Sequence, residues 1–474
     1  MCDYAGHIIT YLPGPKIGTV ALTLFTPVAV PTIAVIGSGL AGGLLVQGLG
    51  RYADVTLLER GKRLPTAPKG VRLIGHPLGL SQTFTYGVGG TTNLWRGCML
   101  SMRPDEFGQD WPEAIKHQIR THSKSVMHHL YGTSVSQAWE SKQRPKPSRP
   151  YVLDTVYAPT APFRIAKLRG LKGASVRLES FVESIVETVD GVALTVCSNG
   201  HTTKLVFDYV IIAAGAINSP LLLQRSGLGG EQAGLNLTDH PMGMVAKVRR
   251  GRSFNRYDAM SLQGSWKKVA KFHDNKTGLW TSFQLCPAPD LLFDGDEYLI
   301  SGLRQSSMRL FSFQKWKKLA STEYCAMMAR KLTGRGRLGP FAFVLAMTEQ
   351  EARGQGKIRG SRDGGVDLEW QVSERACGAV RRSLSAFEQW LGCDLELAPG
   401  NVKNRLWSGA HHAGSCRISR DANSGVVDDN LRVHGTSRIF VCDASVLPST
   451  GATNPGLTIG SLALRLAAHI RQLR

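Results

Sequence analysis

Three glycines near the start of the sequence have the spacing of a turn that binds a dinucleotide. They are Gly37, Gly39 and Gly42 in the segment GSGLAG. The first permits a tight turn, the second lets the backbone approach a pyrophosphate, and the third lets a helix pack closely on a strand. The first turn of that helix offers N–H groups and a positive partial charge to phosphates. Glu59, further along, can accept hydrogen bonds from both ribose hydroxyls.

The segments around these glycines have the order strand, turn, helix, strand. Residues 32–36 (TIAVI) form an apolar run, residues 43–49 form an apolar stretch after the turn, and residues 54–58 form a second run that ends at Glu59. These neighbours favour a site for an ADP-containing cofactor over the alternative, a glycine-rich turn without a ligand. The turn alone does not separate FAD from NAD.

Further elements follow in the middle of the chain. Residues 174–213 contain short alternating segments separated by Asp-Gly and Asn-Gly pairs, which predicts a β-meander. Residues 208–214 (DYVIIAA) predict a buried strand, and a helix is expected over about 219–225. Residues 135–165 are rich in Ser, Pro, Lys and Arg, which predicts a loop or a domain crossing.

The carboxyl-terminal part contains two predicted helices and a short strand. Residues 373–391 have an amphipathic helical pattern closed by a glycine, and residues 439–441 predict a strand. A final helix is expected over 455–471, with Asn454 as its N-cap and Pro455 as its first residue.

The bulk composition is that of a globular protein. Of 474 residues, 42% are hydrophobic and 20% charged, which excludes disordered, collagenous and low-complexity classes. The formal net charge of +21 predicts attraction for anions such as acidic substrates, polysaccharides, lipid headgroups or nucleic acid. The alternative is a basic surface without a specific partner. Zinc-finger spacing and RNA-recognition motifs are absent from the sequence, which argues against nucleic acid.

The cysteines and the amino-terminal segment bear on location. The nine cysteines include no CxxC pair, which argues against a disulfide framework and a metal site and favours a reducing, cytoplasmic compartment. Residues 17–30 are apolar but fall short of the ~20 residues that span a bilayer. We interpret residues 1–31 as an N-terminal extension, with a signal-peptide core as the alternative. We expect no transmembrane anchor.

Four separated motifs occur in a family-specific order. The first is the dinucleotide turn with Glu59, and the second is residues 87–97 (GVGGTTNLWRG). The third is residues 215–229, followed by residues 234–241 (GLNLTDHP). The fourth lies in residues 411–461 and comprises HHAGSCRI, VVDDNLRVHG and VCDASVLPSTGATNPGLT. Together they resemble the glucose–methanol–choline (GMC) family of FAD-dependent oxidoreductases.

This resemblance implies an α/β fold. It consists of a Rossmann-like FAD-binding domain and a discontinuous substrate-binding domain built on a β-sheet covered by helices. We expect the FAD-binding domain to comprise residues 32–110, 172–240 and 417–474, and the substrate-binding domain to comprise residues 111–171 and 241–416. Residues 242–405 match no family motif, and the family binds substrate there.

The resemblance also implies the reaction, hydride transfer from a C–OH carbon to flavin N5 with loss of the hydroxyl proton. The family's base is the His three residues before the Gly of HxxG(S/T), which here is His411, and a neutral His suits that task near pH 7. On an extended strand, His412 would point the other way. The alternatives are His412 as the base, or structural roles for both. The family's second polar group corresponds to Asn454, which can bond the substrate oxygen, the alternative being a plain helix N-cap.

Contacts to the cofactor follow from the same resemblance. The N-terminus of the helix at Pro455 would stabilise negative charge at the flavin N1–C2 edge. Asp443 and Ala444 would bond the ribityl chain, with a strand-end cap as the alternative for Asp443. Leu94 stands where some members carry a flavin-linking His, and residues 77–111 contain no His, so we predict non-covalent FAD. The expected cofactor-binding residues are Gly37, Gly39, Leu40, Ala41, Gly42, Glu59, Arg60, Gly89, Gly90, Thr91, Asn93, Leu94, Ala214, Gly215, Asp443, Ala444, Asn454, Pro455 and Thr458.

The favoured substrate is the secondary hydroxyl of a sugar or glycoside. The HxxGSxR form and the GG-to-Trp loop are similar to bacterial sugar-oxidising branches, and the basic charge favours an anionic substrate. Oxygen or a quinone would accept the electrons. The alternatives are a FAD-containing lyase, similar to the hydroxynitrile lyases, and a non-catalytic flavoprotein.

Overall fold

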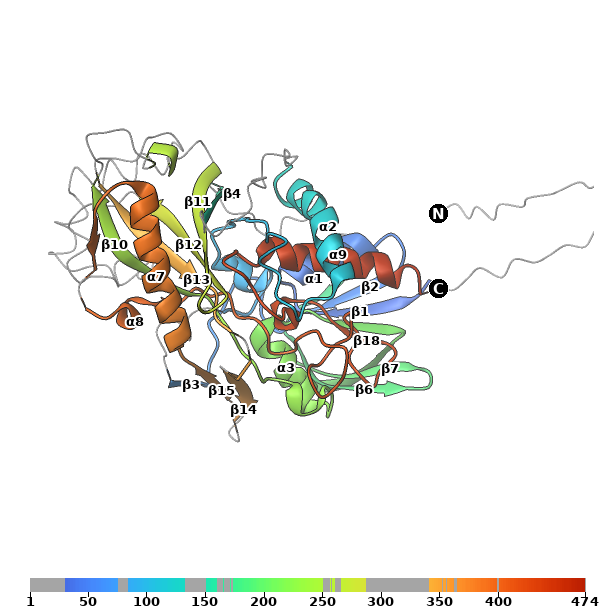
Figure 1. Ribbon diagram of the computed structural model, residues 1–474. Coiled ribbons are helices and arrows are strands. Elements are labelled where there is room, and N and C mark those ends of the chain that lie inside the picture. The colour runs from blue at the N-terminus through green and yellow to red at the C-terminus, as the bar shows by residue number, and fades with distance from the viewer. Residues whose placement is uncertain are drawn as a thin grey trace, which may run out of the picture. The chain divides into compact units, whose positions relative to one another are not determined.

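A computed structural model shows the folded part of the chain (Figure 1). It describes residues 30–75, 84–132, 151–159, 165, 171, 174–249, 256, 258–260, 266–286, 341–351, 353–354, 356–361, 365–398 and 400–473. The predicted N-terminal extension and its apolar run lie outside the described residues up to position 29. From Pro31 onward the chain belongs to one folded unit.

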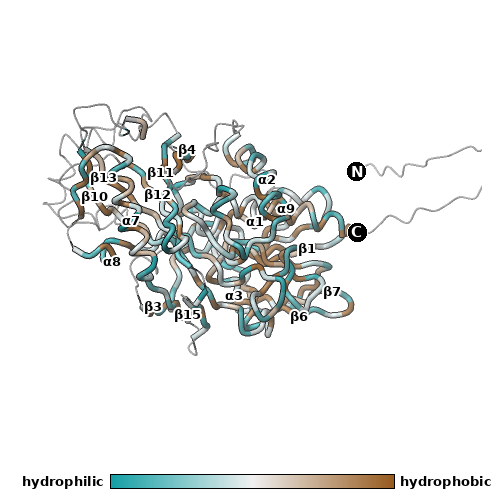
Figure 2. Tube along the Cα trace, in the orientation of Figure 1, coloured by the Kyte–Doolittle hydropathy of each residue, from teal (hydrophilic) through white to brown (hydrophobic). Residues whose placement is uncertain are grey.

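A five-stranded parallel sheet has the order β18-β9-β1-β2-β5. Its strands are β1 (Thr32–Ile36), β2 (Asp54–Leu58), β5 (Ser175–Arg177), β9 (Tyr209–Ile212) and β18 (Ile439–Val441). The central strand β1 lies between β2 and β9, and its residues Ile33–Ile36 are buried, as expected for a strand that is covered on both faces. Figure 2 shows hydrophobic residues gathered around this strand.

Three helices pack together beside this sheet. They are α1 (Leu40–Leu49), α2 (Glu113–Tyr131) and α9 (Gly456–Ile470), and α9 contacts both of the others. A Cβ on Gly460 of α9 would lie 2.8 Å from a Val126 methyl and 3.1 Å from a Leu44 methyl, so glycine permits the close approach. A further helix, α3 (Gly215–Arg225), follows β9 and packs on the meander.

An antiparallel sheet has the order β16-β10-β13-β12-β11-β4, with β17 also paired to β10. The strands are β4 (Tyr151–Tyr157), β10 (Pro241–Arg249), β11 (Trp266–Asp274), β12 (Leu279–Cys286), β13 (Phe341–Thr348), β16 (Leu395–Leu397) and β17 (Trp407–Ser408). Helix α7 (Glu374–Leu391) covers β11, β12 and β13, and its Phe387 ring stacks on Phe283 with centroids 4.9 Å apart (Figure 1). The predicted fold class is confirmed.

Two small sheets complete the described structure. One contains β3 (Val71–Gly75), β14 (Lys357–Gly360) and β15 (Val366–Trp370), and the other is the meander of β6 (Ser180–Thr188), β7 (Gly191–Ser198) and β8 (His201–Phe207). Short helices occur at η2 (Gly90–Asn93), η6 (Gly230–Gln232), η7 (Asp258–Met260), α8 (Val402–Arg405) and η9 (Ala444–Val446). No helix in these described ranges is both long and apolar enough to cross a membrane.

Several local predictions are confirmed and three need correction. The meander, the helix capped by Ser373 and the strand β18 form as expected. The loop predicted across residues 135–165 is wrong over residues 151–157. These residues form β4, which pairs with β11. Helix α3 begins at Gly215 rather than near residue 219, and α9 begins at Gly456. The two-domain division stays a prediction.

Candidate active site

The predicted dinucleotide turn connects β1 to α1. Gly37 has a φ of +104°, which residues with a Cβ rarely adopt. A Cβ on Gly42 would lie 1.9 Å from the Gly37 carbonyl oxygen, whereas a Cβ on Gly39 would meet no described atom within 4 Å. Gly39 therefore faces open space at the N-terminus of α1, where the first N–H groups, including those of Leu40 and Ala41, are available to an anion. This space fits a pyrophosphate.

Two alanine substitutions distinguish packing from ligand contact at this turn. Gly39→Ala is expected to preserve the fold, because the φ of −70° and ψ of −165° suit alanine, but to weaken flavin retention at least about tenfold. Gly42→Ala is expected to destabilise the protein itself by about 1–3 kcal/mol through overpacking. Thermal unfolding and flavin absorbance after gel filtration measure the two effects. Full flavin retention by folded Gly39→Ala protein would contradict the assignment of the open space at Gly39 to the pyrophosphate.

The carboxylate of Glu59 faces the backbone of the turn. Its Oε2 accepts hydrogen bonds from the Ser38 N–H at 3.1 Å and the Ser38 hydroxyl at 2.6 Å. Its Oε1 accepts from the N–H groups of Gly61 at 2.8 Å and Gly87 at 3.0 Å. A carboxylate offers about four lone-pair positions, so protein donors use all of them here. The ribose contact stays a prediction, and it requires the ribose to replace one of these donors.

Arg60 follows Glu59 just after β2, and its side chain is exposed. Its guanidinium lies 4.5 Å from the ring centroid of Tyr86 and 4.5 Å from that of Phe181. Two such cation–π contacts hold the planar group in one place. Its contact with the cofactor remains a prediction.

The Gly–Gly loop lies against the dinucleotide turn. The Gly89 N–H donates to the Ser38 carbonyl at 3.2 Å and is 3.1 Å from the Ser38 hydroxyl. A Cβ on Gly90 would lie 3.3 Å from the Cα of Gly39. The Asn93 amide donates to two carbonyls of its own loop, at 2.9 and 3.0 Å, and so maintains the loop's shape. The structure thus brings the first and second motifs together.

The end of this loop reaches α9. Thr91 and Leu94 are exposed. The ring of Trp95 lies 3.3 Å from where a Cβ on Gly456 would stand, and Gly456 is the first residue of α9. The second motif therefore also contacts the fourth.

Asp443 joins the carboxyl ends of β18 and β9. Its Oδ2 accepts from the Gly215 N–H at 2.8 Å and the Ser219 hydroxyl at 2.5 Å, and its Oδ1 accepts from the Ser445 N–H at 2.8 Å. Burial raises the pKa of Asp443, although these hydrogen bonds oppose the effect. The cap that the sequence left as an alternative is present, and the ribityl contact stays a prediction.

A line of hydrogen bonds passes through two histidines to Asn454. The Nε2 of His240 lies 2.6 Å from the Gly451 carbonyl oxygen, and its Nδ1 lies 2.9 Å from Nδ1 of His411. The other ring nitrogen of His411, Nε2, lies 3.3 Å from Nδ2 of Asn454. His240 is fully buried, whereas His411 and Asn454 are half-buried. The two residues predicted to be catalytic therefore touch, although 43 positions separate them.

Asp239 anchors the backbone around these histidines. Its Oδ1 accepts from the N–H of His240 at 2.7 Å and the N–H of His411 at 2.8 Å. Its Oδ2 accepts from the Ser408 hydroxyl and lies 3.0 Å from Nδ1 of His412. Burial opposes ionisation of Asp239, but the His412 ring and the hydrogen bonds outweigh it and lower the pKa to about 2. Asp239 is therefore an anion that both peptide N–H groups stabilise.

The extended strand predicted at His411 is wrong, although the adjacent histidines do diverge. No strand covers residues 409–412, and Ala410 has a φ of +61° in the left-handed region. The His411 ring faces His240, whereas the His412 ring faces Asp239. Which histidine is the base stays a prediction.

The N-cap predicted for Asn454 is also wrong. Pro455 occupies the cap position of α9, and its carbonyl accepts the first helical hydrogen bond, from Ile459. The Asn454 amide nitrogen instead faces His411. Its buried Oδ1 has no hydrogen-bond partner among the residues that the structure describes. An unsatisfied buried amide oxygen beside a half-buried imidazole fits a site that a ligand completes.

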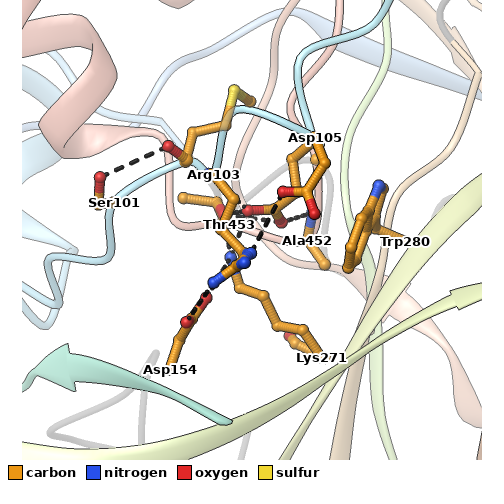
Figure 3. A network of polar contacts seen from close by, with 12 residues as sticks. Ser101, Arg103, Asp105, Asp154, Lys271, Trp280, Ala452 and Thr453 are labelled. Atoms are coloured by element: carbon orange, nitrogen blue, oxygen red, sulfur yellow. Dashed lines mark hydrogen bonds and ion pairs between the residues drawn. The ribbon is translucent and has the colours of Figure 1, made fainter. Parts of the chain in front are cut away.

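A buried ionic network supports the loop that carries Asn454, and no sequence motif identified it (Figure 3). Lys271 Nζ lies 2.6 Å from Glu106 Oε2 and 2.7 Å from the Thr453 hydroxyl. Glu106 Oε1 accepts from the Ala452 N–H at 3.0 Å. Asp154 lies 3.6 Å from Lys271 and pairs with Arg103 at 3.0 Å. The one local signal is Lys271 itself, a charge between the apolar residues Ala270 and Phe272.

Glu349 holds the same loop from the other side. Its Oε1 accepts from the Gly451 N–H at 3.1 Å, and its Oε2 lies 3.4 Å from the Trp280 N–H. Burial, reinforced by the neighbouring Glu106, raises the pKa of Glu349 to about 8 from the ordinary 4.5. Between about pH 4.5 and about pH 8, the folded state therefore binds more protons than the unfolded chain.

This difference predicts a pH-dependent stability. The free energy of unfolding is expected to fall as the pH rises from about 4.5 to about 8, because the folded state must lose the extra proton. Glu349→Gln should reduce this slope, whereas Glu231→Gln, on an exposed residue, should preserve it. Urea unfolding at about pH 5 and about pH 8 measures the effect. An unchanged slope in Glu349→Gln would contradict the assignment.

The predicted residues thus form two neighbouring groups. One surrounds the dinucleotide turn and the Gly–Gly loop, and the other surrounds His411, with Trp95 and Gly456 linking them. Pro455 and Thr458 lie buried in the first turn of α9, and Ala214 and Ala444 follow β9 and β18. In the described ranges, no cluster of His, Cys, Asp or Glu is arranged to hold a metal ion.

The chain is similar to known proteins in sequence and structure. It is 26% identical over 289 residues to an uncharacterized GMC-type oxidoreductase of Mycobacterium tuberculosis, covering 57% of this chain and 40% of that protein. It is 40% identical over 93 residues to a long-chain-alcohol oxidase of Arabidopsis thaliana, covering 20% of this chain and 12% of that protein. It resembles the structure of pyridoxine 4-oxidase from Mesorbium loti with a TM-score of 0.60 and 17% identity. The match covers 93% of this chain and 99% of that one.

These alignments span less than half the length of the curated relatives just named. Two family models described as GMC oxidoreductase match residues 171–242 and 365–463. The first contains α3 and Asp239, and the second contains His411 and Asn454. On these matches, together with the shared fold, the chain belongs to the GMC oxidoreductase family.

Proposed function

We propose that this chain binds FAD and oxidises a C–OH group of a small molecule to a carbonyl, with His411 as the base. The observation that carries the proposal is the 3.3 Å contact between His411 Nε2 and Asn454 Nδ2 beside the start of α9. An imidazole lone pair can accept a hydroxyl proton, and an amide N–H can donate to the same oxygen. Family membership supports an alcohol as substrate, as does a relative named for long-chain alcohols.

The cofactor-binding residues are assigned by the same reasoning. We assign the pyrophosphate to residues 37–42, the ribose to Glu59 and Arg60, and the flavin to residues 89–94 with the start of α9. We assign the ribityl chain to residues 443–444 and to Gly215. Bound FAD would supply the acceptor for the hydride that leaves the carbinol carbon. The open space before Gly39 and the unpaired oxygen of Asn454 support this fit.

The protein groups then have distinct tasks. Asn454 donates its amide hydrogen to the substrate oxygen and holds the C–OH group against His411. The hydroxyl proton moves to Nε2 of His411, and the oxygen electron pair forms the carbonyl as the hydride leaves the carbon. Asp239 holds the His411 backbone, at 2.8 Å, so that the ring keeps its position when it becomes charged.

Within this function we favour the secondary hydroxyl of a sugar or glycoside, with oxygen or a quinone as electron acceptor. The HxxGSxR form of the fourth motif and the net charge of +21 support an anionic sugar derivative. The buried free thiols Cys377, Cys416 and Cys442 are consistent with a cytoplasmic location.

Anaerobic reduction of the flavin tests this function. The flavoprotein is mixed with neutral sugars, uronic acids, glycosides and linear alcohols, and bleaching of its absorbance is followed. We expect bleaching by a sugar derivative, and re-oxidation by air or by a soluble quinone identifies the acceptor. Bleaching by linear alcohols alone would reject the sugar assignment. A panel without any bleaching would favour the lyase or the non-catalytic alternative.

We also predict that the FAD is not covalently attached. The loop residue at the linking position is Leu94, which cannot form such a bond. Trichloroacetic acid precipitation should therefore release all of the yellow colour into the supernatant. Flavin in the protein pellet would contradict this prediction.

A further inference from the structure

His240 lies behind His411 and has no role in the reaction described above. It belongs to the GLNLTDHP segment, and its side chain is fully buried. The two rings are nearly perpendicular, with an interplanar angle of 87° and centroids 5.0 Å apart. They therefore meet through the two Nδ1 atoms, 2.9 Å apart, and do not stack.

The proton on His240 is determined by its other neighbour. Nε2 of His240 lies 2.6 Å from the carbonyl oxygen of Gly451, and a carbonyl oxygen only accepts hydrogen bonds. Nε2 must therefore carry a hydrogen and donate it. Burial lowers the pKa of His240, and Lys271 lowers it further, whereas the Gly451 carbonyl and Asp239 oppose this effect. The ring is then neutral, and its Nδ1 is an acceptor.

The proton on His411 follows from that of His240. Because Nδ1 of His240 accepts, Nδ1 of His411 must be the donor of the 2.9 Å contact. A neutral His411 then has its lone pair on Nε2, where Asn454 Nδ2 can donate to it at 3.3 Å. The opposite tautomer would place two lone pairs against each other at Nδ1 and two hydrogens against each other at Nε2.

We propose that His240 is a positioning residue that holds His411 in the tautomer with a hydrogen on Nδ1 and the lone pair on Nε2. This tautomer leaves Nε2 ready to accept the substrate proton. Its importance for catalysis rests on the proposed function, in which His411 is the base. After His411 accepts that proton, its Nδ1–H still donates to His240, so the same contact serves both charge states. The Gly451 carbonyl is itself held in place, because the N–H of the same peptide unit, that of Ala452, donates to Glu106 at 3.0 Å.

The tautomer can be measured without a substrate. The holoprotein is labelled with ¹⁵N-histidine, and long-range ¹H–¹⁵N spectra show which nitrogen of each neutral ring carries hydrogen. His411→Asn identifies the signals of His411 by their disappearance. We expect a protonated Nδ1 and an unprotonated Nε2 in the wild type. A protonated Nε2 on neutral His411 would overturn the proposal, whatever the enzyme's substrate proves to be.

Two variants test the part played by His240. His240→Leu removes the acceptor, so His411 should shift toward the tautomer with hydrogen on Nε2. His240→Asn presents an amide oxygen in place of Nδ1 and should restore the wild-type pattern. With a substrate in hand, His240→Leu should lower kcat by roughly 10²–10⁴-fold with little change in KM, and His240→Asn should recover most of that loss.

The outcomes separate this proposal from the proposed function. An unchanged His411 tautomer in folded His240→Leu protein would overturn the role of His240 while leaving His411 as the base. Undiminished flavin reduction in His411→Ala would overturn the base assignment while the wild-type tautomer still stands. If His240→Leu does not fold, His240→Asn and the wild-type spectrum decide the question.

Discussion

Replacing His411 by Ala is expected to lower the rate of flavin reduction by substrate about 10²–10⁴-fold, the range that a general base contributes. Alanine leaves the hydroxyl proton without an acceptor at the position that Asn454 Nδ2 faces across 3.3 Å. The bound flavin and the fold should persist, since His411 is only half-buried and Asp239 bonds its backbone. Anaerobic stopped-flow absorbance with the substrate found in the panel measures the rate.

Two further histidine variants make this result specific. His201→Ala replaces an exposed histidine of the meander strand β8 and should retain the wild-type rate. His412→Ala tests the alternative base, and its ring faces Asp239 rather than Asn454. A large loss in His412→Ala together with a wild-type rate in His411→Ala would transfer the role of base to His412.

Lys271→Met is expected to destabilise the protein by about 3–5 kcal/mol, because it leaves buried carboxylates without their cation. Lys271 and Glu106 have no exposed side-chain area, and Asp154 is 3% exposed. Methionine fills a similar volume to lysine, so the loss of stability would come from the missing charge and not from a cavity. Urea unfolding measures it. The loop over residues 451–454 should loosen as well. We expect kcat to fall because Gly451 and Asn454 are then no longer held in place.

A surface ion pair provides the matched control. Lys403 lies 3.0 Å from Glu374, with side chains that are 34% and 72% exposed. Lys403→Met should leave the free energy of unfolding nearly unchanged, since water screens such a pair. A similarly small loss in Lys271→Met would show that the buried network contributes little to stability. Combining Lys271→Met with Glu106→Gln should recover part of the loss if the unpaired Glu106 charge is its cause.

Local signals predicted much of the framework. Strand β1 and the turn at Gly37 were predictable because an apolar run and glycine spacing act within ten residues of each other. Helix α7 was predictable for the same reason, with Ser373 capping its first turn through the Ala376 N–H. Strand β4 was missed because its partner β11 lies more than a hundred residues away, and pairing at that distance leaves no local pattern.

The sequence by itself determined the family motifs, the dinucleotide turn and the choice of His411 and Asn454 as candidates. Only the tertiary structure decided that His240, 171 positions from His411, stands behind its ring, and that Lys271, 165 positions from Glu106, neutralises that carboxylate. The physical reason is that glycine conformation and helix capping depend on neighbouring residues. A hydrogen bond between two side chains depends instead on how whole sheets pack, which no short segment encodes.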